Sequence, residues 1–290
     1  MPDSYLELSY WQVAAAALLI AVNGAVSLCL RLGLERQLAI ASIRMTAQLI
    51  LVGLVLRWVF ALNVAYAVVS LMVLMTLIAG VSAVERTKSR YPGIWVSSII
   101  SVWASSWLVG GIALFGIIDV EPWYRPRYAV PLLGMILGNT LSGISLGLDR
   151  FSSELDVRRD EIETYLALGA TRWEAASSPA REAVRTAMIP TLNAMMVTGI
   201  VSLPGMMTGQ LVSGIDPTQA VRYQLVIMFL IAAGTALGSV AVVLLSFRFL
   251  FDAWHRLRLP PHCSTEGGRD TSPPDPLATN SYSGSSAVRL

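Results

Sequence analysis

Long runs of apolar residues dominate the pattern along this chain. Seven runs can be marked, at roughly 11–30, 38–56, 61–82, 94–118, 131–148, 191–213 and 223–247. Each run approaches the length of about twenty residues that a helix needs to cross a hydrocarbon layer about 30 Å thick. A strand would leave its backbone polar groups unpaired in lipid, so each run predicts a helix. The pattern therefore predicts an all-α, polytopic membrane protein with about seven transmembrane helices.

Two polar stretches interrupt this pattern. The first, residues 149–188, holds 14 of the 40 charged groups of the chain. The second is the tail, residues 260–290, in which 14 of 31 residues are Pro, Gly or Ser. A segment of that composition cannot bury enough apolar surface to fold. We therefore divide the chain into a transmembrane domain, residues 1–259, and a disordered tail, residues 260–290.

Basic residues near the predicted spans are shared unevenly between the two sides of the membrane. Fourteen arginines and lysines fall on one side and four on the other. Because the side richer in basic residues stays in the cytoplasm, the N-terminus and the loop 119–130 are predicted to lie outside. Residues 149–188 and the tail are then cytoplasmic. We expect a multi-pass protein of the cell membrane (inner or plasma membrane).

Composition supports this class and argues against others. Hydrophobic residues make up 54% of the chain and charged residues 14%, with a mean hydropathy of +0.61. An ordinary soluble domain has about 25% charged residues. The net charge of +2 leaves no basic surface for nucleic acid. His255 and His262 both follow the last run, and no catalytic or metal-ligand cluster is recognisable, so we expect no catalytic residues and assign no metal ligand.

Residues 149–188, called the elbow below, contain several helix boundary signals. Ser152 or Ser153 is placed to cap a first helix, and Gly169 lies where a left-handed cap would end it. Thr171 and Glu174 have capping-box spacing and would open a second short helix around Trp173. Ser178 and Pro179 would open a third. The elbow is either an ordinary solvated loop or a docking element that presents an exposed tryptophan to a cytoplasmic partner.

Three stretches of sequence carry a family resemblance. They are LALGATRWEA (166–175), REAVRTAMIPTLNAMM (181–196) and LPGMMTGQLVSGIDPTQAVRYQLVIMF (203–229). They resemble the FetB-type (YbbM-like) family of ABC transporter permeases, which is associated with iron export in bacteria and, in its plant relatives, with aluminium tolerance. The third stretch is the most specific. The resemblance implies a permease subunit that exports iron or another metal.

The resemblance also implies partners and coupling residues. The chain has no phosphate-binding glycine loop before its single lysine, Lys88, so ATP and Mg would be bound by a separate ABC ATPase subunit and no cofactor by this chain. The working unit would be a permease homodimer with two ATPase subunits, embedded in membrane lipid. The residues implied in ATPase coupling are Leu168, Gly169, Ala170, Thr171, Trp173 and Glu174.

The sixth predicted span contains candidates for the transport path. Pro204 and Gly205 fall within it and predict a break in the helix, and broken helices often line transport sites. Met195 and Met206 are eleven residues apart and would share a helical face, as would Met196 and Met207. Gln210 follows Met206 by one turn. Thioethers suit soft metal ions, but paired methionines are also ordinary packing residues, and hard ferric or aluminium ions fit them poorly.

Polar residues in two further spans also require interpretation. Arg44 and Gln48 lie one turn apart in the second span, either on the path or as an anchor near the headgroups. The fifth span combines Asn139, a further path candidate, with glycines four residues apart that favour close helix packing. No Asp or Glu lies well inside a span, which argues against a proton relay. The alternative function is a seven-span secondary transporter or receptor that works without an ATPase.

Overall fold

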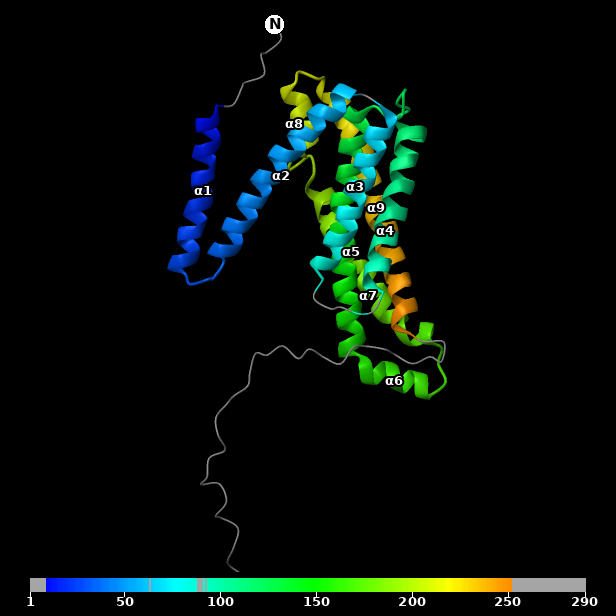
Figure 1. Ribbon diagram of the computed structural model, residues 1–290. Coiled ribbons are helices and arrows are strands. Elements are labelled where there is room, and N and C mark those ends of the chain that lie inside the picture. The colour runs from blue at the N-terminus through cyan, green and yellow to red at the C-terminus, as the bar shows by residue number, and fades with distance from the viewer. Residues whose placement is uncertain (1–8, 63, 88–90, 92, 252–290) are drawn as a thin grey trace, which may run out of the picture. The chain divides into compact units, whose positions relative to one another are not determined.

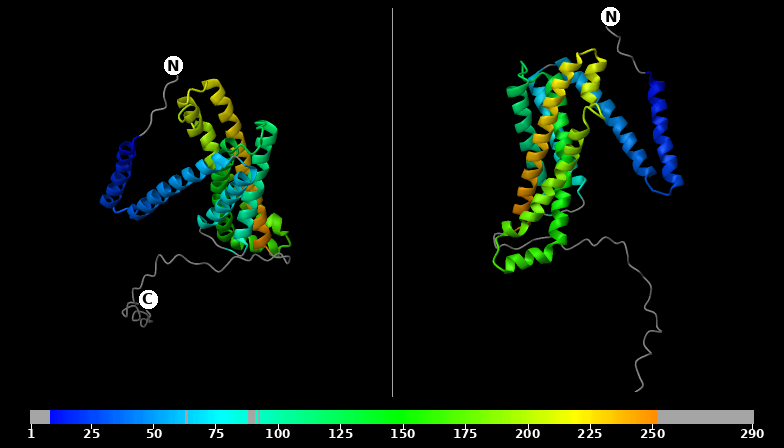
Figure 2. Two further views of the ribbon diagram at one scale, coloured as in Figure 1. Left: turned by 45° about the horizontal axis from the view of Figure 1, so that its top comes forward. Right: turned by 180° about the vertical axis from the view of Figure 1, so that it is seen from behind.

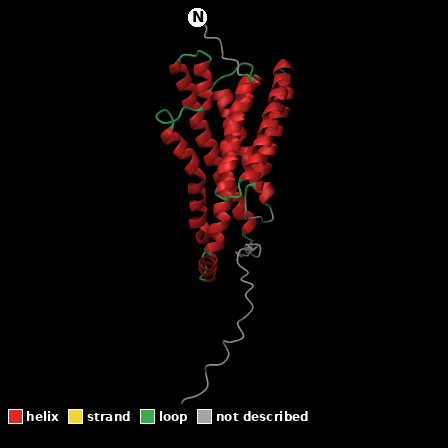
Figure 3. Cartoon of the chain, turned by 90° about the vertical axis from the view of Figure 1, so that its left-hand side faces the viewer, coloured by secondary structure: helices red, strands yellow, loops and turns green. Residues whose placement is uncertain are grey.

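The computed structural model describes residues 9–62, 64–87, 91 and 93–251, so the predicted tail lies outside the described residues. Figure 3 shows that these residues form helices joined by short loops. The helices are α1 (Tyr10–Cys29), α2 (Glu35–Leu62), α3 (Ala65–Glu85), α4 (Ile94–Gly111), the π-helix η1 (Ile112–Ile117), α5 (Pro126–Val157), α6 (Arg159–Ala167), α7 (Arg172–Val197), α8 (Gly205–Val212) and α9 (Pro217–Leu250). The predicted all-α fold is confirmed.

Six segments of the described chain are long and apolar enough to cross a membrane. They are α1, α2, α3, α4 with η1, α5 and α9. The apolar run at 191–213 does not form one continuous helix, in agreement with the break predicted at Pro204 and Gly205. Helix α7 ends at Val197 and α8 begins only at Gly205. The eight residues of α8 are too few to cross a hydrocarbon layer.

The chain turns within the sixth predicted span, just before the residues at which a break was predicted. Gly199 has a φ of +88°, a conformation that favours glycine, and Pro204 takes the N-cap position of α8. Helices α5 and α9 both run from the top to the bottom of Figure 1, and α7 followed by α8 returns the chain to the top between them. Together α7 and α8 thus take the place of one spanning helix, while the count of seven crossings and the orientation stay predictions.

Helix α5 lies at the centre of a bundle with α3, α4, α7 and α9 (Figure 2). Small residues bring these helices close together. A Cβ atom on Gly143 would lie 2.5 Å from Thr235 Cγ2 of α9, and one on Gly147 would lie 3.4 Å from Ala187 Cβ of α7. Predicted packing at these two glycines is confirmed, and it fixes α5 between α7 and α9.

The first two helices form a hairpin with few contacts to this bundle. Its link is ordered, because the Ser27 hydroxyl donates to Glu35 Oε2 (3.1 Å) and accepts from the Leu34 N–H (3.0 Å). Val59 is the one buried residue of α2 among those described, and most apolar side chains of both helices are exposed. In a membrane protein such surfaces face lipid or another protein chain.

Candidate functional site

The elbow lies at one end of the bundle, where α6 crosses beneath the ends of α5 and α7 (Figure 1). Its helix boundaries differ from the predicted ones. No helix begins at Ser152 or Ser153, because α5 continues to Val157 with its buried residues Phe151 and Leu155 extending the apolar stripe. No third helix begins at Pro179 either, and α7 is continuous across it. Burial of that proline against the bundle compensates for its one missing backbone donor.

A buried carboxylate ties the elbow to the bundle. Glu154 of α5 accepts from two arginines, with Arg150 Nη2 of the same helix at 2.8 Å from Oε1 and Arg158 Nε, at the junction of α5 and α6, at 2.9 Å from Oε2. Arg158 also donates through Nη1 to the Ser178 hydroxyl of α7 (3.2 Å), and Arg150 Nη2 lies 4.0 Å from Glu182 Oε1 of α7. Each oxygen of Glu154 therefore has a charged partner, and both partners reach α7.

Apolar residues give the elbow a small core of its own. Phe151 and Leu155 of α5, Ile162 of α6 and Ala176 of α7 are at most 1% exposed and belong to the hydrophobic core. Helix α6 is thus held by burial of Ile162 in addition to its covalent links. Burying one such side chain contributes about 1.5–3 kcal/mol, so the elbow is a firmly attached part of the bundle.

The turn between α6 and α7 has the predicted conformation. Gly169 has a φ of +91°, its N–H donates to Leu166 O (3.1 Å), and the Ala170 N–H donates to Tyr165 O (3.0 Å). These two bonds are the Schellman pattern that ends a helix at a left-handed residue. The predicted glycine cap is confirmed, and the space around Gly169 is open, with no atom within 4 Å of an added Cβ.

The start of α7 has the predicted capping box. The Glu174 N–H donates to the Thr171 hydroxyl (3.3 Å), and the Thr171 N–H donates to Glu174 Oε2 (2.8 Å). Bonds from the Thr171 backbone and then from its hydroxyl lower the pKa of the Glu174 carboxyl below its ordinary value. The prediction of this cap is confirmed, and it fixes the direction in which α7 leaves the turn.

Trp173 is exposed, as predicted, but it is not a free knob. The residue is 48% exposed, and its ring packs edge-on against Phe247 of α9, with 5.4 Å between ring centroids. The Arg172 guanidinium carbon lies 5.8 Å from the centroid of that same Phe247 ring. Trp173 therefore joins the elbow to α9 on one side and leaves only its other side free.

Three further apolar side chains of the elbow are exposed in addition to Trp173. Leu168, next to Gly169, is 80% exposed, as is Val157 at the junction of α5 and α6. Tyr165 is half exposed and lies one turn before Leu168. Val157 and Tyr165 were missed by the sequence analysis. Leu168 was among the predicted coupling residues, and Tyr165 could have been found from its spacing of three residues to Leu168, because the inward stripe of α6 is occupied by Ile162 and Leu166.

The path candidates are distributed over four helices. Met195 and Met206 are not on one helix, so the prediction of a shared face is wrong, as it is for Met196 and Met207. Met206 packs against the bundle core, and Met196 is exposed. The others lie on separate elements, with Gln48 on α2, Asn139 on α5, Met195 on α7, and Met207 and Gln210 on α8.

Two buried amide oxygens stand out near the end of the bundle opposite the elbow. Gln210 Oε1 on α8 and Gln224 Oε1 on α9 are buried and accept no hydrogen bond from any described residue. The helices that carry them are in contact. Gln224 was missed, although it belongs to the YQ pair of the third family stretch. In the ranges that the structure describes, no group of three His, Cys, Asp or Glu side chains could hold a metal ion.

Comparison with known proteins identifies relatives along most of the chain. The model of the family described as "Uncharacterised protein family (UPF0014)" matches residues 10–251. The UPF0014 membrane protein slr1647 of Synechocystis is 42% identical over 226 residues, covering 78% of this chain and 87% of the relative. Escherichia coli has a relative named probable iron export permease protein FetB, 30% identical over 249 residues, covering 84% of this chain and 93% of the relative.

A plant relative is more distant. The Arabidopsis protein ALUMINUM SENSITIVE 3 is 26% identical over 245 residues, covering 84% of this chain and 88% of the relative. No solved structure matches the chain. The predicted resemblance to bacterial iron export permeases and to aluminium-related plant proteins is thereby confirmed.

Proposed function

Because this chain belongs to the UPF0014 family of membrane proteins, we propose that it is the permease subunit of an ABC transporter that exports iron or another metal. ATP and Mg would be bound and used by a separate ATPase subunit, and two permeases would assemble with two ATPases. The name of the Escherichia coli relative supports metal export. The observation that carries the coupling role is the elbow, which is rigid, capped at both helix ends and apolar at its exposed tip.

The connections of α7 suggest how a push on the elbow would reach the transport path. The helix begins beside Gly169, is linked to α5 through Ser178 and Arg158, and packs along α5 and α9. It ends at Val197, where the chain leaves helical geometry before α8. Movement of α7 would therefore shift α8, which carries Met206 and Gln210, through a jointed connection rather than a stiff rod.

The polar groups available to a metal cargo are amides and thioethers. Asn139 is exposed at membrane depth on α5, and Gln210 and Gln224 have buried oxygens without partners. Amide oxygens suit harder cations and the Met206 sulfur suits softer ones. These groups are too few and too dispersed for a tight cage, which favours a ferrous or chelated form of iron as the substrate.

Copurification tests this function directly. The tagged full-length chain, solubilised in mild detergent, should retain a partner that carries a phosphate-binding loop. Leu168→Asp should reduce that retention about 30-fold, because an exposed apolar anchor contributes about 2 kcal/mol or more to such an interface. Leu32→Asp, the same change at a 55%-exposed leucine in the link between α1 and α2, is the matched control. Absence of any ATPase partner would favour a secondary transporter or receptor.

A further inference from the structure

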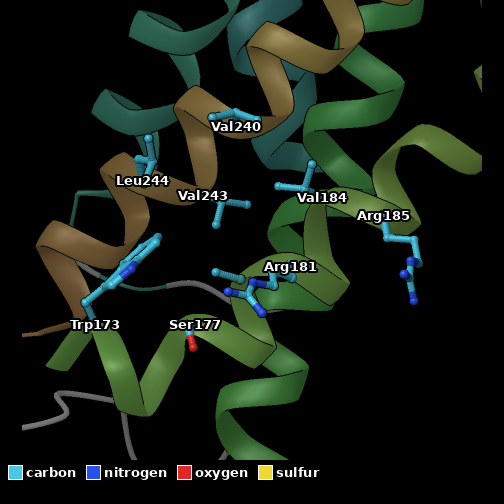
Figure 4. A pocket seen from close by; sticks show the side chains of 9 residues that line it. Trp173, Ser177, Arg181, Val184, Arg185, Val240, Val243 and Leu244 are labelled. Atoms are coloured by element: carbon cyan, nitrogen blue, oxygen red, sulfur yellow. The ribbon is translucent and has the colours of Figure 1, made fainter. Parts of the chain in front are cut away.

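Helices α7 and α9 enclose a groove beside Trp173. Its volume is about 370 Å³. Figure 4 shows Trp173, Val184, Val240, Val243 and Leu244 around it, with the Arg181 side chain along its lower edge. Six of the nine lining residues are apolar and the other three are Ser177, Arg181 and Arg185, so the groove is a hydrophobic surface with cations at its rim.

The outer wall of this groove is formed by a membrane-spanning helix. Val240, Val243 and Leu244 lie on α9, one of the helices long and apolar enough to cross a bilayer. Val240 and Leu244 are 41% and 44% exposed at the surface of the bundle. In a bilayer, that surface is covered by lipid chains unless another protein covers it.

The charged rim lies at the boundary between the apolar and polar parts of α7. No charged residue follows Arg185 on that helix, whereas Arg181 and Arg185 both line the groove. Arg185 has a long ion pair with Glu182 (3.8 Å). Arg181 has no hydrogen bond or ion pair with any residue that the structure describes. The exposed Arg181 guanidinium beside an apolar groove suits an anionic group with an apolar tail.

We propose that this groove binds one anionic phospholipid from the leaflet on the elbow side. The phosphate contacts the Arg181 guanidinium, with Arg185 nearby, and an acyl chain lies between Val184 and the α9 residues Val240 and Leu244. Trp173 closes the headgroup end, the position that tryptophan favours at a membrane interface. A neutral lipid would fill the same walls but would leave the charge of Arg181 uncompensated.

The site has a structural consequence for the elbow. Trp173 is part of the groove wall and at the same time packs on Phe247. Bound lipid would therefore hold the start of α7 against α9.

Native mass spectrometry of the full-length chain in mild detergent tests the proposal. The sample is mixed with equal amounts of phosphatidylglycerol and phosphatidylcholine that carry the same acyl chains. The wild-type chain should retain one phosphatidylglycerol in preference, and Arg181→Gln should lower that retention about fivefold, the effect of one interfacial arginine. Arg181→Lys should keep the preference, and Val240→Trp should fill the groove and lower retention at unchanged charge.

A charge-matched control distinguishes binding at the groove from a general loss of positive charge. Arg159→Gln removes the same charge from an exposed position on α6 and should leave lipid retention unchanged. Equal retention of the two lipids, or wild-type retention by Arg181→Gln, would overturn the proposal. So would complete displacement by inorganic phosphate, which would show that no acyl chain is needed. Conversion of a dimer to a monomer by Val240→Trp would assign the groove to a second copy of the chain instead.

Discussion

The two ends of α7 differ in how the chain is held. At the elbow end, a Schellman turn, a capping box, the Glu154 ion pairs and a buried isoleucine all act on a short segment. At the other end, residues 198–204 form a turn whose side chains Ile200 and Val201 are 89% and 81% exposed. Backbone hydrogen bonds hold both ends, but only the elbow end also has buried side chains, so the turn at 198–204 is the less firmly packed of the two. One helix thus joins a firmly packed elbow to an exposed turn.

The largest expected effect is the difference in cysteine labelling between the two sides of the membrane. In a chain with Cys29 and Cys263 replaced by Ser, cysteine at Glu121 should react with an impermeant thiol reagent added to intact cells. Cysteine at Ala167, an exposed position in the elbow, should react only after the membrane is opened. The expectation follows from the excess of basic residues on the elbow side. The reverse labelling pattern would exclude a cytoplasmic partner for the elbow.

Binding of the ATPase by the elbow should be weakened most by a substitution at its glycine turn. Gly169→Val forces a β-branched residue into a positive φ, which costs about 1–3 kcal/mol and would distort the exit of α7. We expect ATPase retention to fall about tenfold or more while the protein still inserts into the membrane. Gly205→Ala, at the first residue of α8, has a free Cβ position and should have no such effect. Wild-type retention of the ATPase by Gly169→Val would contradict a role of this turn in ATPase binding.

The link between α5 and α7 should show a smaller effect. Glu154→Gln keeps the shape of the side chain but removes its charge from between Arg150 and Arg158, and we expect a loss of about 1 kcal/mol in stability. The arginines remain partly solvated, which limits the loss. Thermal unfolding in detergent measures it. Glu163→Gln breaks an exposed pair with Arg159 and should lower the unfolding temperature less; equal shifts would show that the buried carboxylate has no special role.

Substitutions in α8, beyond the exposed turn, should change transport and leave stability nearly unchanged. Met206→Leu nearly preserves volume and should cost less than about 1.5 kcal/mol. If the thioether contacts the cargo, metal efflux from cells or its preference among metals should change, and Gln210→Ala should behave in the same way. Met196→Leu, at a 70%-exposed methionine, is the control. Normal transport by both variants would identify Met206 and Gln210 as packing residues.

The smallest effect should come from acidification of the capping box. The pKa of Glu174 is lowered in the folded chain, so its contribution to stability is present above the unfolded pKa of about 4.3. That contribution is lost as the pH falls through the lower folded value. The unfolding temperature of wild type should therefore drop slightly more than that of Glu174→Gln between pH 6 and acidic pH of about 3. Parallel curves for the two proteins would rule out this cap as a source of pH dependence.

Much of the elbow could be predicted because its turn depends on near neighbours. The Gly169 cap and the Thr171–Glu174 box involve bonds across three to five residues, so their spacing alone was sufficient. The predicted start at Ser152 or Ser153 failed for the opposite reason. Local capping preference there is overridden by burial of Phe151 and Leu155 against other helices, which the sequence pattern does not display.

The sequence by itself determined a helical membrane protein, because runs of apolar residues can satisfy their backbone in lipid only as helices. It also determined the family and the turn at Gly169. Only the tertiary structure decided that Trp173 turns toward Phe247, that Leu168 is left at the tip, and that the methionines of the sixth run lie on separate helices. These outcomes depend on which distant helices meet, and packing between segments far apart in the chain leaves no periodic signal in either one.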